Sequence, residues 1–320
     1  PSPNRRTNGS SSSGPRKYVT VTGEPCCLQC NIVRYRYVLT HPVPACFHIW
    51  QDRETGMKAI VLLGFMAAVA ALPAAAQEHQ DINEANNPLT PKITINLQDY
   101  FIPGFKDTPG DPHANQFLLR GLIPSDMWGM PQLLRFTLPI ATSPDEPSGY
   151  VTGLGDLTLM DIFILPKKGD VTFGAGPLLV VPTATDDSLG SGKWQIGAVG
   201  IGVAPQDWGL LGGLVTYQTS FAGSDSREDV NLFTFQPIVN VNISDGWYIR
   251  STATWSFDLE SGDKYIPVGL GIGKVFKLDK GVTMNAFVEP QYTVWNEGSA
   301  PRWQISAGLN FQFPIGQHNQ

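Results

Sequence analysis

Apolar and polar residues alternate along much of the chain beyond residue 90. In the segment 302–313, Trp303 and Ile305 fall on one face, whereas Gln304 and Ser306 fall on the other. Successive side chains of a β-strand point to opposite faces, so this period predicts strands with one apolar and one polar side. The same alternation recurs at 233–243, 246–258 and 282–294.

The pattern predicts twelve strands, joined by connections of two kinds. The first, third and later odd connections are mostly long and rich in acidic residues or proline, whereas the even connections are mostly short. Such a chain runs up and down, with tight turns at one rim and longer loops at the other. The expected strands span 92–100, 115–123, 131–140, 154–165, 170–181, 193–204, 208–221, 230–243, 246–258, 264–276, 281–294 and 302–313.

Two features favour lipid over a soluble core as the partner of the apolar faces. Many of the expected strands have eleven residues or more, whereas soluble strands have about 5–6 and a tilted membrane strand needs about 9–11. The polar faces suit a wet lumen, and Trp194, Trp208, Trp247 and Trp303 lie at strand ends, where interfacial girdles form. We therefore expect an all-β fold, a transmembrane antiparallel up-and-down β-barrel of about 12 strands.

The segment 57–76 has the features of a secretory signal peptide. Lys58 opens it, an apolar run follows, and small residues close it at Ala74 and Ala76. We expect translation to start at Met57, so that 1–56 is an upstream non-native, disordered extension and the barrel occupies 77–320. The alternative keeps 1–56 as genuine sequence and makes 57–76 a membrane anchor, although its apolar run is short for a spanning helix of roughly 20 residues.

Charge and cysteine content change at this segment. Residues 77–320 carry fourteen Lys and Arg against twenty-five Asp and Glu, a net charge near −11, which predicts no nucleic-acid partner. All four cysteines lie upstream, at positions 26, 27, 30 and 46, so the expected barrel does not depend on disulfides. Cys27 and Cys30 have the spacing of a metal or redox pair, but no second pair accompanies them, and we predict no metal site.

A series of motifs occurs in order between residues 153 and 276, and the most specific reads PTATDDSLGSGKW. Through these motifs the sequence resembles, over 86–314, the outer-membrane barrel family labelled "MetA-pathway of phenol degradation", a family of transporters. The resemblance implies a Gram-negative outer-membrane barrel and a role in the uptake of small, aromatic or hydrophobic solutes. The motifs are Gly153–Asp156, Phe173–Pro177, Pro182–Trp194, Gln236–Pro237, Asp245–Tyr248 and Pro267–Phe276.

The C-terminal strand resembles the assembly signal that outer-membrane barrels present to the insertion machinery. Ser306, Gly308, Phe311 and Phe313 fit its spacing, although the chain continues to Gln320. The resemblance implies the barrel-assembly machinery as a partner, beside outer-membrane lipid, lipopolysaccharide and small-molecule solutes.

Charged and amide side chains on the polar faces are the candidate lumen residues. Opposed charges across a pore set a transverse field that biases permeation. The alternative is that they pair and fill a narrow interior, since a twelve-stranded barrel lies between filled eight-stranded barrels and open porins. The candidates are Arg120, Arg135, Asp156, Thr216, Gln218, Arg250, Glu289 and Gln291.

Two further clusters admit both a chemical and a structural interpretation. Asp186, Asp187, Asp225 and Asp229 form an acidic loop rim, which we interpret as solvated in preference to a divalent-cation site. Glycines at 269, 271 and 273 before a lysine mimic a phosphate loop, but they alternate within a strand pattern and so are expected to permit close packing.

We predict no catalytic residue and no cofactor. The expected barrel has only His79, His113 and His318 and no nucleophile elbow, although a wall hydrolase that pairs His113 with a serine is an alternative. The residues 87–91 precede the first strand and offer a short plug. The predicted function is an outer-membrane channel or transporter for small solutes; the alternative is a structural or adhesive barrel with a plugged lumen.

Overall fold

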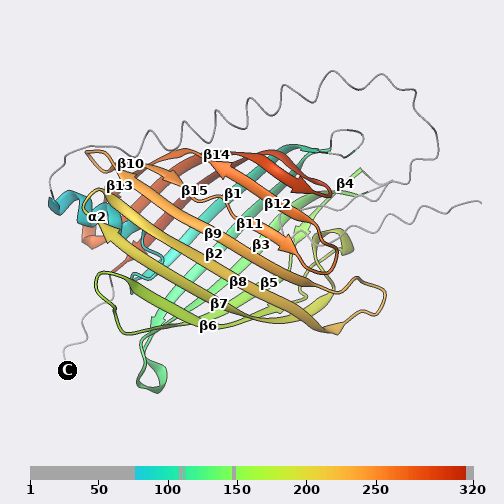
Figure 1. Ribbon diagram of the computed structural model, residues 1–320, viewed down its shortest axis with the longest axis horizontal. Coiled ribbons are helices and arrows are strands. Elements are labelled where there is room, and N and C mark those ends of the chain that lie inside the picture. The colour runs from blue at the N-terminus through green and yellow to red at the C-terminus, as the bar shows by residue number, and fades with distance from the viewer. Residues whose placement is uncertain (1–75, 107, 109, 111, 146–148, 315–320) are drawn as a thin grey trace, which may run out of the picture.

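Twelve antiparallel strands close into a barrel, as the sequence predicts (Figure 1). Three wall strands are each divided in two, so fifteen strand segments make the twelve wall strands. The expected extension 1–56 and signal peptide 57–76 lie outside the described residues, apart from Ala76. The computed structural model describes residues 76–106, 108, 110, 112–145 and 149–314.

One helix precedes the strands, and three short 3₁₀ turns interrupt the connections. The helix is α2 (Ala76–Asn86), and the turns are η2 (Met127–Gly129), η3 (Asp187–Leu189) and η4 (Asp279–Gly281). The strands are β1 (Ile93–Lys106), β2 (Ala114–Ser125), β3 (Gln132–Asp145), β4 (Gly149–Leu154), β5 (Leu157–Ile164), β6 (Thr172–Val181), β7 (Lys193–Gln206), β8 (Gly209–Gly223), β9 (Asn231–Asn242), β10 (Trp247–Ser251), β11 (Trp255–Asp258), β12 (Lys264–Gly269), β13 (Gly271–Lys277), β14 (Thr283–Glu297) and β15 (Ala300–Phe313).

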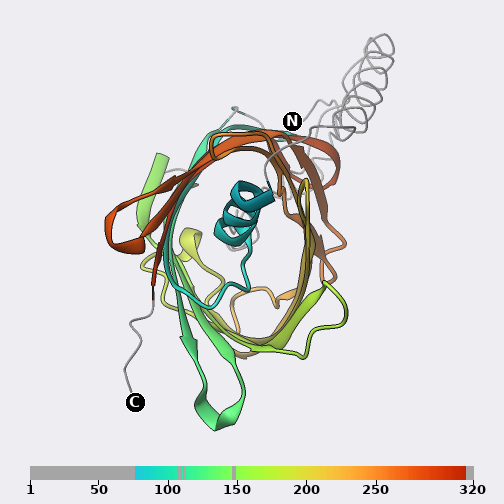
Figure 2. The same cartoon turned by 90° about the vertical axis from the view of Figure 1, so that its left-hand side faces the viewer.

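Strands β1 and β15 form the seam that closes the wall. Ile93 pairs with Phe313 at one end of the seam, and Lys106 pairs with Ala300 at the other. The other wall strands pair with their neighbours in sequence, which makes the predicted up-and-down meander. The view along the barrel shows the wall closed around its interior (Figure 2).

Three interruptions divide wall strands into the pairs β4–β5, β10–β11 and β12–β13. Gly155 and Asp156 separate the first pair, residues 252–254 the second, and Leu270 the third. The two halves of each pair share one neighbour, which is β3, β9 or β14 in turn, so the wall stays continuous across each break.

The strands extend further toward the long-loop rim than the alternation predicts. The first expected strand ends at residue 100, whereas β1 continues to Lys106, and β14 continues to Glu297. The register of β1 against β15 shifts between Phe101 and Gly104, so a bulge breaks the period of two that marks the strand. The short-turn rim lies where the sequence places it.

Over most of the wall, apolar side chains face outward and polar side chains face inward, apart from an inner apolar cluster that packs around Leu89. Along β15, Trp303 and Ile305 are 48% and 41% exposed, whereas Gln304 and Ser306 are 2% exposed. This distribution is the reverse of a soluble domain and fits a wall with lipid outside. Other exposed apolar side chains that continue the outer surface are Ile95, Phe101, Ile140, Leu159, Phe173, Ile196, Val215, Ile272, Val288 and Leu309.

Tryptophans mark both rims of the apolar surface. Trp194, Trp295 and Trp303 are exposed close to the long loops, and Trp247 is exposed at the opposite rim, beside the turn between β9 and β10. Indole side chains favour the boundary between acyl chains and water, so these positions bound the membrane-facing band.

Candidate functional site: the barrel lumen

Helix α2 lies inside the barrel at the short-turn end (Figure 2). Ile82 and Ala85 are buried in one apolar cluster with Tyr248 and Val275 of the wall. No helix in the described part of the chain is long and apolar enough to cross a membrane. The pattern of apolar and polar residues did not predict α2. The helix is mostly polar, and the lumen around it is mostly polar too, so the helix has no marked apolar face.

Amide side chains and turns of the wall hold α2 in place. Asn83 donates through Nδ2 to the carbonyl of Gln206 at 2.8 Å, and Asn242 donates through Nδ2 to Asn83 Oδ1 at 2.9 Å. The buried His79 donates through Nδ1 to the carbonyl of Asp207. These contacts tie the helix to the end of β7, the following turn and the end of β9.

The segment 87–91 continues from α2 into the lumen, where the sequence suggested a plug. Leu89 is buried in an apolar cluster on the inner wall. Its backbone N donates to Asn87 Oδ1 at 2.9 Å, and Thr90 Oγ1 donates to the carbonyl of Glu84 at 2.9 Å, so the segment is braced internally. The cluster around Leu89 consists of Leu122, Leu133, Ile162, Val199, Ile201, Val203, Leu210 and Ile238.

At the opposite end, the loop 182–192 folds into the mouth of the barrel. Leu189 of η3 is buried against Ile102, Phe105, Ala114 and Ala141 of the wall. The length of this loop gave no indication that it turns inward. The lumen is therefore narrowed at both ends, by α2 at one rim and by η3 at the other.

Asp156 anchors this loop. The residue is fully buried at the break between β4 and β5. Its Oδ1 accepts from the backbone N of Ala184 at 3.1 Å, and its Oδ2 accepts from the backbone N and Oγ of Ser191 at 2.7 and 2.9 Å. The two quoted motifs that contain Asp156 and Ser191 thus contact each other.

A chain of polar side chains extends this anchor along the wall. Gln195 Nε2 donates to Ser191 Oγ at 2.9 Å, and Gln218 Nε2 donates to Gln195 Oε1 at 2.7 Å. Gln218, a candidate lumen residue, is therefore part of the loop's support. Another candidate, Thr216, shares a 2.7 Å hydrogen bond with Thr234 of the next strand.

The acidic loop residues lie around the same mouth, and Asp186 and Asp229 pair with nearby donors. Ser188 donates to Asp186 through its hydroxyl and its backbone N, which holds the pKa of the Asp186 carboxyl below its usual range. The Nζ of Lys193 lies 3.0 Å from Asp229 and lowers the pKa of that carboxyl. Asp187 and Asp225 are exposed. Among the described residues, no three His, Cys, Asp or Glu side chains group as metal ligands would.

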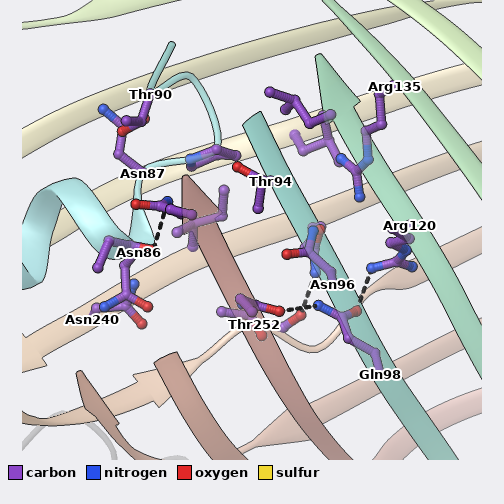
Figure 3. A pocket seen from close by; sticks show the side chains of 18 of the residues that line it. Asn86, Asn87, Thr90, Thr94, Asn96, Gln98, Arg120, Arg135, Asn240 and Thr252 are labelled. Carbon is purple, nitrogen blue, oxygen red and sulfur yellow. Dashed lines mark hydrogen bonds between the residues drawn. The ribbon is translucent and has the colours of Figure 1, made fainter. Parts of the chain in front are cut away.

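A central cavity of about 140 Å³ lies between the two narrowed ends (Figure 3). All three predicted lumen arginines, Arg120, Arg135 and Arg250, line it. Polar side chains line most of the cavity, while a few aliphatic side chains of β2, β7, β8 and β9 form an apolar part. The polar residues are Asn86, Asn87, Thr90, Thr94, Asn96, Gln98, Tyr100, Gln236, Asn240, Thr252, Asn310 and Gln312.

Glu289 neutralises Arg250 at this cavity. Arg250 Nε donates to Glu289 Oε2 at 2.8 Å, and the guanidinium stacks 3.6 Å from the ring centroid of Phe287. The fully buried Glu289 also accepts from the backbone N and Oγ1 of Thr252, both at 2.8 Å, and from Nε2 of Gln291 at 3.2 Å. The predicted residues Arg250, Glu289 and Gln291 therefore form one hydrogen-bonded group.

The alternating glycines make space for this group. A Cβ on Gly269 would lie 2.1 Å from Glu289 Oε1, and one on Gly271 would lie 2.6 Å from Glu289 Cβ. A Cβ on Gly273 would lie 2.3 Å from the ring of Tyr248. The glycines lie in and beside β12 and β13, without the helix that a phosphate loop requires, so the expected close packing is confirmed.

A second cavity, of about 730 Å³, lies beside α2 at the short-turn end. His79, Asn83 and Gln206 line it on one side, and Ile164 and Thr172 of β5 and β6 line it on the other. Asn87 and Thr90 line both cavities. The segment 87–91 is thus the partition between the centre of the lumen and the short-turn rim.

Comparison with solved structures supports the barrel fold. The COG4313 outer membrane channel from Pseudomonas putida F1 is similar with a TM-score of 0.53 at 16% identity, over 71% of this chain and 97% of that chain. The KdgM porin (TM-score 0.39, 11% identity, 70% and 99% coverage) and outer membrane phospholipase A from Escherichia coli (0.36, 12%, 75% and 99%) are more distant. No protein-family model and no curated protein matches the sequence.

The closed wall, its apolar outer surface and this likeness identify a barrel of the bacterial outer membrane. The predicted fold and location are therefore confirmed. Short turns of such barrels face the periplasm and long loops face outward, so α2 lies at the periplasmic end and η3 at the external end.

Proposed function

We propose that this protein is an outer-membrane channel for small solutes and that solutes pass beside α2. The observation that carries the proposal is the pair of cavities on either side of segment 87–91, both lined by Asn87 and Thr90. The helix is hydrogen-bonded to β7, β9, β13, β14 and β15, which leaves the side toward β5 and β6 open. The proposed route leads from the central cavity past segment 87–91 and along this open side to the periplasmic rim, without removal of the helix.

The lumen chemistry supports passage of polar or amphipathic solutes. Amide and hydroxyl groups around the central cavity can replace the hydrogen bonds that a solute loses when it leaves water. The resemblance to phenol-degradation transporters suggests aromatic compounds as one solute class, and the aliphatic part of the cavity wall offers contact for a ring. The channel proposal does not depend on this solute class.

A flux measurement tests the channel. Proteoliposomes should swell in isosmotic small sugars and aromatic acids, and planar bilayers should show discrete conductance steps in KCl. Asn87→Trp places a bulky side chain where Asn87 lines both cavities and should lower the conductance severalfold, whereas Ser226→Trp in an exposed loop should leave it unchanged. No flux and no conductance from correctly folded protein would refute the channel.

A plugged structural barrel is the second candidate, because α2 and η3 narrow both ends of the lumen. Conduction separates the two functions, because a permanently plugged barrel does not conduct, and a bis-methanethiosulfonate bridge between Asn83→Cys and Asn242→Cys then tests whether α2 has to move. The barrel part of the chain has no native cysteine, so the reagent joins only these positions. If solutes pass beside a fixed helix, the bridged protein conducts; if passage requires release of α2, bridging stops conduction.

A further inference from the structure

The charges that line the central cavity do not balance. Arg250 is neutralised by Glu289 at 2.8 Å. In the part of the chain that the structure describes, no ion pair joins either Arg120 or Arg135 to a carboxylate. Two positive charges therefore remain in the middle of the lumen.

These two arginines are neighbours on one face of the wall. Leu122 pairs with Arg135, and Arg120 pairs with Thr137, which places the arginines diagonally across β2 and β3. Diagonal neighbours on one face of an antiparallel pair lie about 7–8 Å apart, and like charges in such positions repel. Figure 3 shows both side chains directed into the same cavity. The repulsion favours an arrangement in which an anion lies between them.

The hydrogen-bonding capacity of the pair is also incomplete. Arg120 donates through Nη1 to Gln98 Oε1, but its enclosed Nε has no hydrogen-bond partner in the structure. A guanidinium has five N–H donors in a planar fork that matches the two oxygens of a carboxylate. An enclosed donor left unpaired costs free energy, which a bound carboxylate would recover.

The cavity has an apolar side as well. Leu122 lies beside the arginines, and Ile201, Leu214 and Ile238 line the cavity from β7, β8 and β9. A second charge on the ligand would have to lie against these aliphatic side chains without a partner, which is unfavourable. The cavity therefore suits a ligand with one charged end and one apolar end.

We propose that Arg120 and Arg135 form a binding site for a small monocarboxylate with an apolar body. This inference rests on the channel proposed above and names its solute class. The carboxylate lies between the two guanidinium groups, and the apolar body contacts Ile201, Leu214 and Ile238. The neutral pair of Arg250 and Glu289 adds polarity without attracting a second anion.

Calorimetry on the full chain in detergent tests the site with sodium benzoate as the probe. Benzoate should bind saturably, while its neutral isostere benzamide and the shorter anion acetate should bind roughly tenfold more weakly or worse. Equal binding of benzoate and benzamide would overturn the role of charge. Equal binding of benzoate and acetate would overturn the role of the apolar wall. Neither comparison requires a variant to fold.

Variants then assign the site to its residues. The double change Arg120→Gln with Arg135→Gln should lower benzoate affinity roughly tenfold or more. Arg302→Gln, at an exposed position on β15, should not change it. Benzoate affinity retained by a correctly folded double variant would overturn the assignment. A barrel that conducts KCl without binding benzoate refutes only this site, whereas a barrel that binds benzoate without conducting refutes only the channel.

Discussion

Arg250 of β10 reaches past β13 to bond Glu289 of β14, with 2.8 Å between Nε and Oε2. The contact crosses β13. This is possible because Gly271 of β13 lies beside Arg250 and has no side chain to block it. The side chains of Arg250 and Glu289 are 12% and 0% exposed, so the pair is enclosed within the barrel. This pair is the basis of two predictions.

Glu289→Gln should destabilise the barrel and shift its ion selectivity toward anions. The change leaves the enclosed Arg250 without its counter-charge, and removal of one partner of a buried pair costs about 3–5 kcal/mol, less where water enters the lumen. The temperature at which the folded barrel loses its shifted mobility in SDS electrophoresis measures the stability, and the reversal potential in a KCl gradient measures the ion selectivity. Glu297→Gln breaks the exposed pair with Lys264, also 2.8 Å long, and should change stability by less than about 1 kcal/mol. Equal effects of the two changes would contradict this account.

Gly271→Ala should destabilise the same region by about 1–3 kcal/mol. Its Cβ would lie 2.5 Å from the carbonyl oxygen of Val288 and 2.8 Å from Cα of Glu289, and backbone atoms cannot rotate away. Gly200→Ala is the control, since its nearest neighbour is a side-chain methyl of Val215 at 3.1 Å. Urea-induced unfolding in detergent measures both, and a Gly271 variant as stable as the control would refute the packing argument.

Asp156→Asn should loosen the loop 182–192 without opening the wall. The carboxylate accepts from two backbone N–H groups and the Ser191 hydroxyl, and hydrogen bonds to a charged acceptor contribute about 1.5–3 kcal/mol. An amide that turns its NH₂ toward those donors loses at least one of them. Hydrogen exchange should become faster in 182–192 and stay unchanged in β15, while the exposed Asp170→Asn serves as the control. Unchanged exchange in the loop would contradict the anchor.

The loop should also loosen in acid because of Asp186. Hydrogen bonds from Ser188 lower the pKa of the Asp186 carboxyl. A carboxyl with a lowered folded-state pKa stabilises the loop at pH values above the ordinary pKa, about 3.9, and this stabilisation is lost as pH falls through the lowered value. Exchange in 182–192, corrected for the intrinsic effect of pH, should therefore rise below about pH 4. Asp186→Asn should remove this pH dependence of hydrogen exchange, whereas the control Asp187→Asn, at an exposed position, should keep it. If the pH dependence persists in Asp186→Asn, another titrating group causes it.

Asn242→Ala should free α2 from the wall. The Asn242 side chain donates to the carbonyl of His79 at 3.2 Å and to Asn83 Oδ1 at 2.9 Å, and it is buried. Loss of both bonds should increase hydrogen exchange across 76–86 severalfold and add current fluctuations in bilayers. Asn296→Ala at the external rim is the matched control. Full protection of α2 in Asn242→Ala would show that its remaining contacts suffice.

The wall of the barrel is predictable from the sequence because one physical rule governs it. Side chains such as Ile305 face lipid and those such as Gln304 face the lumen, so the alternation gives both the strands and their faces. The difference in connection length then gives the meander. The outer end of β1 was missed because the bulge between Phe101 and Gly104 interrupts the period.

The contents of the lumen are much less predictable. Helix α2 packs by hydrogen bonds between polar groups, as with Asn83 and Asn242, so it has no broad apolar stripe to identify it. The inward fold of 182–192 depends on Asp156, which lies 26 residues before it. Contacts between distant segments leave no local pattern, although the polar faces did indicate Arg120, Arg135 and Arg250 as lumen residues.

The short link from α2 to the first wall strand constrains how this protein is built. Only residues 87–92 separate Asn86 from Ile93, so α2 has to stay close to β1. Strand β1 pairs with β15, beginning at Ile93 and Phe313. The link therefore keeps α2 beside β1, the strand that closes the wall by pairing with β15. For this chain, we therefore expect closure of the wall and placement of α2 at its short-turn end to be coupled.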